Sequence, residues 1–154
     1  MKRFALSRLR YAACVPGVAL ALAVPLATSG HNPPPLVPIA STRGVTCNKN
    51  TQIGLDGCAA LAAAAADKRL DADIRAVWAR ESSYQRADFA RAQRDWATYR
   101  TADCTSQTDL YRGGSILPME LGYCQAREDG LRRQDLVVLY KTLTQGASKP
   151  PRFP

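Results

Sequence analysis

Apolar positions spaced three and four residues apart dominate the chain after residue 57. Beyond an alanine-rich run, the first apolar stripe comprises Leu70, Ile74, Val77 and Trp78. Such spacing places the apolar side chains on one face of a helix, and alanine is the strongest intrinsic helix former. We therefore predict a first helix that starts at Cys58, after a break at Asp56-Gly57, and is interrupted at Glu81-Ser82-Ser83.

A second periodic stretch precedes a glycine-rich loop and a last helix. Its apolar members are Phe89, Ala92, Trp96 and Tyr99. The aromatic residues expected in the core are Trp78, Trp96 and Tyr99. Arg91 and Asp95, four residues apart, are expected to pair on the solvent side. Gly113-Gly114 and Pro118 predict a loop over residues 105–118.

The last helix is predicted over residues 120–143. Its apolar positions are Leu131, Leu136, Val138 and Leu139. No stretch of the sequence shows the sustained two-residue alternation of a half-buried strand. The predicted fold class is therefore all-α: a small, disulfide-stapled helical bundle or hairpin of three to four helices.

The helical region, residues 47–145, is flanked by segments of different composition. Residues 1–29 combine a basic start, an apolar run and a small-residue end, the layout of a secretory signal peptide. The run is shorter than the ~20 residues of a spanning helix, although an uncleaved N-terminal anchor is the alternative. Residues 30–46 are predicted to be a proline-rich linker and residues 146–154 a disordered tail. The protein is thus expected to be exported, periplasmic or secreted, and to meet a membrane only through an uncleaved leader.

Charge and histidine content exclude several functions. The chain has 21 basic and 13 acidic residues, a formal charge of +8. Four of the basic residues and none of the acidic ones lie in residues 1–30, so the chain without its leader has a net charge of +4. Acidic residues are interleaved with the basic ones, which argues against a nucleic-acid partner. Because His31 is the single histidine, we expect no zinc cluster and no histidine-activated serine or cysteine. The sequence offers no other catalytic constellation, so we expect no cofactor and no enzymatic activity.

Four cysteines remain when Cys14, in the leader, is set aside. They are Cys47, Cys58, Cys104 and Cys124. An even number of cysteines in an exported chain predicts disulfides, because these compartments are oxidising. Four cysteines permit three pairings, and proximity favours Cys47–Cys58 and Cys104–Cys124.

Over residues 47–143 the chain resembles the LprI-type lysozyme inhibitors. The motif residues that carry the resemblance, besides the four cysteines and the stretch Tyr111-x-Gly113-Gly114-Ser115, are Asp67, Leu70, Gln93, Trp96, Arg100 and Arg127. Asp71 and Ile74 depart from the Asn and Tyr that are usual in the first helix of that family. The resemblance implies a small exported helical domain with structural disulfides and a lysozyme-inhibiting activity.

We therefore expect a protein that binds and blocks a lysozyme-like glycosidase, with a non-inhibitory envelope structural or interaction domain as the alternative. The expected contact surface is the loop between Cys104 and Cys124, formed by Tyr111, Arg112, Gly113, Gly114 and Ser115. Arg112 and Ser115 are expected to reach the catalytic carboxylates of the partner. Arg100 is expected to hydrogen-bond carbonyls at the helix end or in this loop, and so to order it.

One physical objection concerns long-range charge. Animal lysozymes are commonly basic, so a partner with a net charge of +4 would be repelled at a distance. Local complementarity is then needed at the contact. The sequence carries no indication of the oligomeric state.

Overall fold

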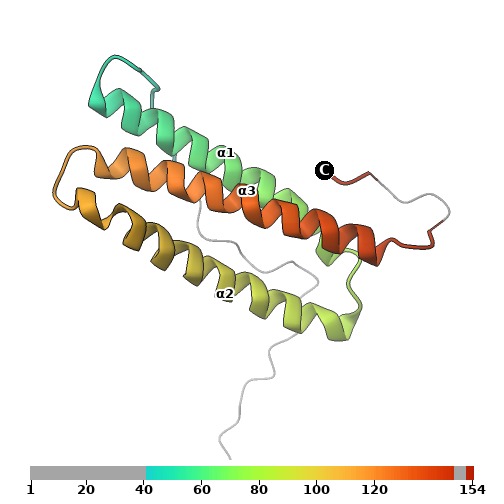
Figure 1. The fold of residues 1–154 in the computed structure, drawn as a ribbon. Coiled ribbons are helices and arrows are strands. Elements are labelled where there is room, and N and C mark those ends of the chain that lie inside the picture. Colours follow the sequence, from blue (N-terminus) through green and yellow to red (C-terminus); the bar gives the residue numbers. More distant parts are fainter. Residues whose placement is uncertain (1–40, 148–151) are drawn as a thin grey trace, which may run out of the picture. The chain divides into compact units, whose positions relative to one another are not determined.

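The computed structural model describes residues 41–147 and 152–154. Three long helices account for most of this part of the chain: α1 (Gln52–Trp78), α2 (Ser83–Thr108) and α3 (Leu117–Leu143) (Figure 1). A short 3-10 turn, η1 (Asp109–Tyr111), follows α2. The described residues contain no strand, which confirms the predicted all-α class. The predicted leader and the first part of the linker lie outside the described residues.

Helix α1 begins at Gln52, six residues before the predicted start at Cys58. The side chain of Thr51 caps it by accepting a hydrogen bond from the backbone N–H of Gly54, 3.1 Å away. Gly57 was expected to break the chain, but it lies inside the helix. A Cβ at Gly57 would collide with the carbonyl oxygen of Thr46, so this glycine serves a close approach of the preceding segment.

The predicted interruption at Glu81-Ser82-Ser83 is confirmed, because α1 ends at Trp78 and α2 starts at Ser83. The backbone N–H of Ser82 donates to the side chain of Gln85 at 3.0 Å, which caps the start of α2. The predicted loop over residues 105–118 is too long. Helix α2 continues to Thr108, and α3 starts at Leu117 with Pro118 in its first turn, where a missing N–H leaves no bond unmade.

The apolar core comprises Leu70, Ile74, Val77, Trp78, Phe89, Leu136 and Tyr140. Trp96 is only partly buried against this cluster. Tyr99 was expected in the core but is 55% exposed. The buried positions of α2 are Phe89, Gln93, Arg100, Cys104 and Thr108. Tyr99 lies off this row of three- and four-residue steps, and therefore faces solvent.

Two other expectations about side-chain placement are wrong, each for its own reason. Leu131 and Val138, predicted on the apolar side of α3, are largely exposed, because Leu136 and Tyr140 occupy the buried row of that helix. Arg91 pairs with Asp88 and not with Asp95. Helical side chains lean toward the N-terminus, which brings Arg91 over the preceding turn.

Helices α1 and α3 lie side by side and run in the same direction, whereas α2 runs antiparallel to both (Figure 1). Near the start of α1, Ala59 meets Gly122 of α3, and further along both helices Asp73 meets Arg133. A Cβ added at Gly122 would lie 3.0 Å from the Cβ of Ala59. The absence of a side chain at residue 122 thus permits the close contact between α1 and α3.

The C-terminal segment that was predicted to be a disordered tail includes Phe153, whose ring centroid lies 4.9 Å from that of Tyr140. In the described part of the chain, no helix combines the length and the apolar character needed to cross a membrane.

Replacement of Gly122 by valine is expected to destabilise the protein by about 1–3 kcal/mol, because the new side chain overpacks the α1–α3 contact. The matched control is Gly130→Val in the same helix, where a Cβ meets nothing within 4 Å. Urea unfolding followed by circular dichroism measures both variants. Equal stability of the two would contradict the close packing at Gly122.

Candidate functional site

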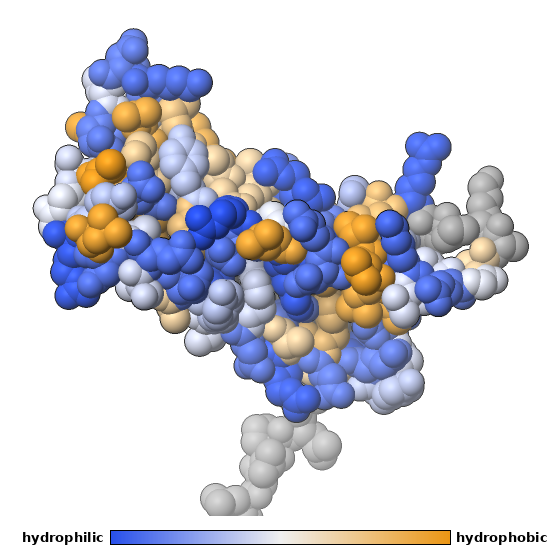
Figure 2. All heavy atoms as spheres, viewed as in Figure 1, coloured by the Kyte–Doolittle hydropathy of each residue, from blue (hydrophilic) through white to orange (hydrophobic). Residues whose placement is uncertain are grey.

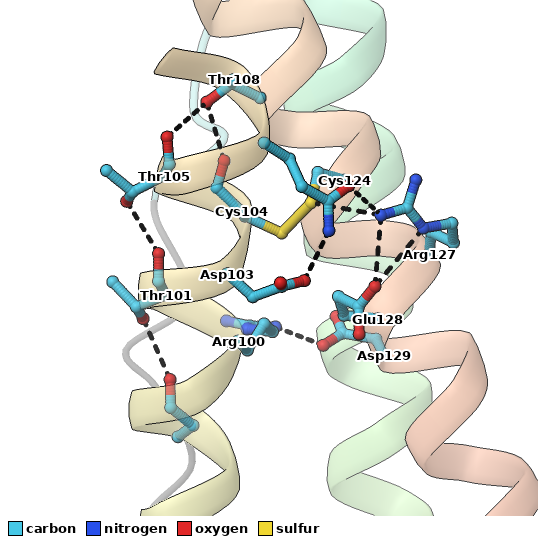
Figure 3. Close-up of a disulfide and its surroundings, with 12 residues drawn as sticks. Arg100, Thr101, Asp103, Cys104, Thr105, Thr108, Cys124, Arg127, Glu128 and Asp129 are labelled. Atoms are coloured by element: carbon cyan, nitrogen blue, oxygen red, sulfur yellow. Dashed lines mark hydrogen bonds and ion pairs between the residues drawn. A yellow bond between two sulfur atoms is a disulfide. The ribbon is translucent and has the colours of Figure 1, made fainter.

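The described residues contain two disulfides, with the pairing that proximity in the sequence favoured. Cys104 of α2 bonds Cys124 of α3, with the Cα atoms 5.7 Å apart (Figure 3). Cys47 bonds Cys58 and attaches the segment before α1 to that helix. The first of these bonds closes the chain between α2 and α3, and therefore holds the intervening loop at both of its ends.

A polar contact reinforces this junction beside the Cys104–Cys124 bond. Arg127 of α3 donates to the side-chain oxygen of Gln107 on α2 at 2.6 Å, and it also pairs with Glu128 at 3.3 Å (Figure 3). The positive charge of Arg127 is thus offset locally by Glu128. Arg127 was assigned a structural role on the basis of family resemblance, and its contacts are those of a residue that links two helices.

The five residues expected to contact a partner lie together at the α2–α3 end of the bundle. Tyr111 is half-buried, whereas the residues from Arg112 to Ser115 are exposed. The amide of Gly114 donates to the carbonyl oxygen of Tyr111 at 2.9 Å, and Gly113 has a φ of 77°, a conformation that favours glycine. Arg112 pairs with Asp109 in η1, and its side chain remains 78% exposed.

A hollow of about 330 Å³ lies beside this loop, between the end of α2 and the start of α3. Its lining residues are Gln107, Thr108, Leu110, Tyr111, Glu120, Tyr123, Cys124 and Arg127. Leu110 and Tyr123 are 75% and 43% exposed. Figure 2 shows separate apolar spots among hydrophilic side chains at this end of the bundle.

Sequence reasoning missed Leu110, Glu120 and Tyr123 as candidate contact residues. Leu110 fell in a segment read only as loop, and Tyr123 looked like an ordinary helix position. The available signal was their proximity to the two cysteines. Because α3 starts three residues earlier than predicted, its first turns bring Glu120 and Tyr123 to the same side as Tyr111.

Arg100 is buried between the three helices and does not reach the loop, so the expectation that it orders residues 111–115 is wrong. Its guanidinium donates to Asp67 of α1 at 2.7 Å. It also donates to Asp129 of α3 (Figure 3). It also lies over the ring of Trp96, 5.3 Å from the ring centroid. Buried carboxylates attract a guanidinium more strongly than exposed carbonyls do, which explains its inward orientation.

Other buried polar groups on the same helix faces connect the helices in pairs. Asp73 of α1 accepts from Arg133 of α3 at 2.6 Å, and Gln93 of α2 accepts from Arg132 of α3 at 3.3 Å. Leu70, another motif residue, belongs to the apolar core. The motif residues Asp67, Gln93 and Arg100 thus lie at contacts between helices. Asp67 and Arg100 also line a second hollow, of about 310 Å³, between α1 and the start of α3. Within residues 41–147 and 152–154, no group of histidine, cysteine and carboxylate side chains is arranged to hold a metal ion.

Burial raises the pKa of Asp129 to about 7, with a smaller contribution in the same direction from the adjacent Asp67 and against the opposing effect of Arg100. Two carboxylates therefore share one guanidinium, and one of them holds a proton up to neutral pH. Burial also raises the pKa of Asp73, although Arg133 opposes this shift. The protonated Asp129 leaves the buried group of Asp67, Arg100 and Asp129 without net charge, which lowers the cost of desolvation.

The pKa of Asp129 makes stability depend on pH. The unfolded value is about 3.9, so between about pH 4 and 7 the folded state holds a proton that the unfolded chain releases. This contribution is complete below pH 4 and is lost as pH rises through 7, by up to about 1.4 kcal/mol per pH unit.

Asp129→Asn should therefore remove this decline, because the amide does not titrate. The measurement is the free energy of unfolding in urea at several values between pH 5 and 8. Asp95→Asn, an exposed position of α2, is the control and should keep the slope of the unchanged protein. An unaltered slope in Asp129→Asn would exclude a proton on Asp129 at neutral pH.

Comparison with known proteins gives one match, to the model of a protein family. Residues 45–136, which include both disulfides, the loop and the Arg100 contacts, match the family model "Lysozyme inhibitor LprI". No curated protein and no solved structure gives a match. The match covers more than half of the chain and agrees with the motif residues found in the sequence. The chain therefore belongs to the LprI lysozyme inhibitor family.

Proposed function

We propose that the protein is an exported inhibitor that binds and blocks a lysozyme-like glycosidase through the loop of residues 111–115. Family membership supports the inhibitory activity. The observation that carries the choice of surface is the exposed loop held at both ends by the Cys104–Cys124 disulfide. The same membership supports a binding protein rather than an enzyme.

The geometry of the loop suits a rigid contact. A loop already held by a disulfide loses little conformational entropy on binding. Tyrosine and arginine are enriched among the residues that dominate interface energetics, and Tyr111 and Arg112 are adjacent here. Gly113 and Gly114 carry no side chain, so backbone can approach a cleft closely.

Arg112 supplies a specific mode of blockage. Glycosidases hydrolyse their substrates with a pair of carboxyl groups in a cleft. The guanidinium of Arg112 pairs with Asp109 on an exposed surface, where such a pair contributes only about 0–1 kcal/mol. It can therefore exchange Asp109 for a carboxylate of the enzyme at small cost.

Export is part of the proposal. Disulfides persist in oxidising compartments, and this domain has two of them after a leader with the layout of a signal peptide. A periplasmic or secreted protein of this family would act where peptidoglycan-cleaving enzymes act. The proposal requires no cofactor, no nucleic acid and no membrane contact beyond an uncleaved leader.

The double variant Tyr111→Ala/Arg112→Ala is expected to abolish inhibition in a lysozyme turbidity assay while the thermal midpoint stays nearly unchanged. Arg112 is exposed and Tyr111 is half-buried, so the change affects the surface more than the core. The matched control is Tyr84→Ala/Arg91→Ala on α2. There the tyrosine is 78% exposed, and the arginine likewise pairs with an aspartate three residues earlier.

Two outcomes contradict the proposal in different ways. Inhibition that survives in the loop variant rules out the loop as the contact surface. A wild-type protein that inhibits no member of a lysozyme panel at any salt concentration supports the alternative, a non-inhibitory interaction domain of the envelope.

A further inference from the structure

The hollow beside the loop combines aromatic walls with a carboxylate that has no ion-pair partner among the described residues. Tyr111 of η1 and Tyr123 of α3 both line it, together with Glu120 from the first turns of α3. Two other carboxylates near the loop have ion-pair partners: Asp109 pairs with Arg112, and Glu128 pairs with Arg127. Asp103 accepts a hydrogen bond from Gln107 and does not line the hollow. Glu120 is therefore the group whose charge is available to a ligand.

Arg127 also lines the hollow, but it does not make the site positive. Its guanidinium donates to Gln107 at 2.6 Å and pairs with Glu128 at 3.3 Å. These contacts hold it against the α2–α3 junction and offset its charge. The net local charge of the hollow is therefore that of Glu120.

The charge of the whole molecule is divided unevenly between the two ends of the bundle. Residues 41–67 and 99–129, which form the end with the disulfides and the loop, contain five basic and seven acidic side chains. Residues 68–98 and 130–147, at the other end, contain ten basic and six acidic side chains. A chain with an overall positive charge thus has a weakly negative end, and that end carries the hollow.

We infer that this hollow binds a cationic side chain, an arginine or a lysine, presented by the protein partner. The inference rests on the proposed function, because it adds a second anchor to the contact made by the loop. It also answers the objection from charge: a basic lysozyme is repelled by the molecule as a whole but attracted by the end that contacts it.

The chemistry of the lining favours a cation over an apolar side chain. A cation near an aromatic face contributes about 0.5–1 kcal/mol at exposed sites. An ion pair with the half-buried Glu120, in a hollow open to solvent, adds about 0–1 kcal/mol. Neither interaction is strong alone, so specificity for a cation comes from having both in one hollow, next to the exposed apolar side chain of Leu110.

The two anchors have opposite charges and lie at the same end of the bundle. Arg112 on the loop is cationic and recognises an anion, whereas Glu120 in the hollow is anionic and recognises a cation. The inferred partner surface therefore presents a carboxylate and a basic side chain next to each other, as the rim of an acidic cleft on a basic protein does.

The test is an NMR titration of the exported protein with N-acetyl-arginine amide, followed through the amide signals of Tyr111, Glu120 and Tyr123. N-acetyl-citrulline amide, which is nearly the same size but uncharged, is the control ligand. We expect saturable shifts at the hollow with the arginine derivative and affinity weakened about fivefold in Glu120→Gln. Asp95→Asn, on an exposed part of α2, should bind as the unchanged protein does.

Equal shifts with both ligands, or no shifts at the hollow, would overturn the inference. No lysozyme is present in this titration, so it tests cation binding by the hollow independently of lysozyme inhibition. A second measurement concerns the partner: Glu120→Gln and Tyr123→Ala should each weaken binding to an inhibited lysozyme, with the loop intact. The unchanged protein could inhibit lysozyme and bind the arginine derivative, while Glu120→Gln and Tyr123→Ala leave the affinity for lysozyme unaltered. That outcome would refute the assignment of the hollow to the partner.

Discussion

The arrangement of the three helices depends on the contacts of one guanidinium, that of Arg100. Helices α1 and α3 have an extensive contact of their own through alanine, glycine and aliphatic side chains. Helix α2 contributes one large buried apolar side chain, Phe89, and its other buried positions are polar or are the disulfide cysteine. Arg100 joins α2 to Asp67 of α1 and Asp129 of α3 at once. Removing one partner of such a buried group typically costs about 3–5 kcal/mol, because an uncompensated charge remains.

This network and the Cys104–Cys124 disulfide lie one helical turn apart on α2, and together they set the position of its C-terminal end. The disulfide constrains the loop covalently, with a loop-closure effect of about 3 kcal/mol for a segment of this size. Arg100 determines the orientation of the helix that leads into the loop. With the framework held by buried groups, the residues from Arg112 to Ser115 are free of structural roles in the core, and their side chains are available for a partner.

The same separation applies to charge. The buried carboxylates Asp67, Asp73 and Asp129 are matched by arginines or by a proton, so they contribute to stability, and Asp129 also makes stability depend on pH. Glu120 is half-buried and lines the hollow, and its carboxylate has no ion-pair partner in the described part of the chain, so it remains available for recognition. A domain with a single modest core can thus use acidic side chains for both purposes, because burial decides which of the two each one serves.

Several features follow from the sequence by itself because their causes are local. Three- and four-residue apolar spacing and the alanine run determine helices, the short separations between cysteines favour the observed disulfide pairing, and the motif around Trp96 and Cys104 indicates the family. The loop of residues 111–115 was also found from its glycines. The predicted helix starts were less accurate. Gly57 resembles a helix break in the sequence, and only the structure shows that the segment at Thr46 packs closely against it.

Only the tertiary structure decided where long side chains go. Arg100 contacts Asp67 and Asp129, which are 33 and 29 residues away in the chain, and no local pattern distinguishes these acids from others. Tyr99 faces solvent because the buried row of α2 passes through Arg100 instead. The hollow lined by Leu110, Glu120 and Tyr123 likewise lies between two helix ends that the Cys104–Cys124 disulfide joins. Helix formation depends on neighbours along the chain, whereas the partners of charged side chains and the shape of a surface depend on which distant segments meet.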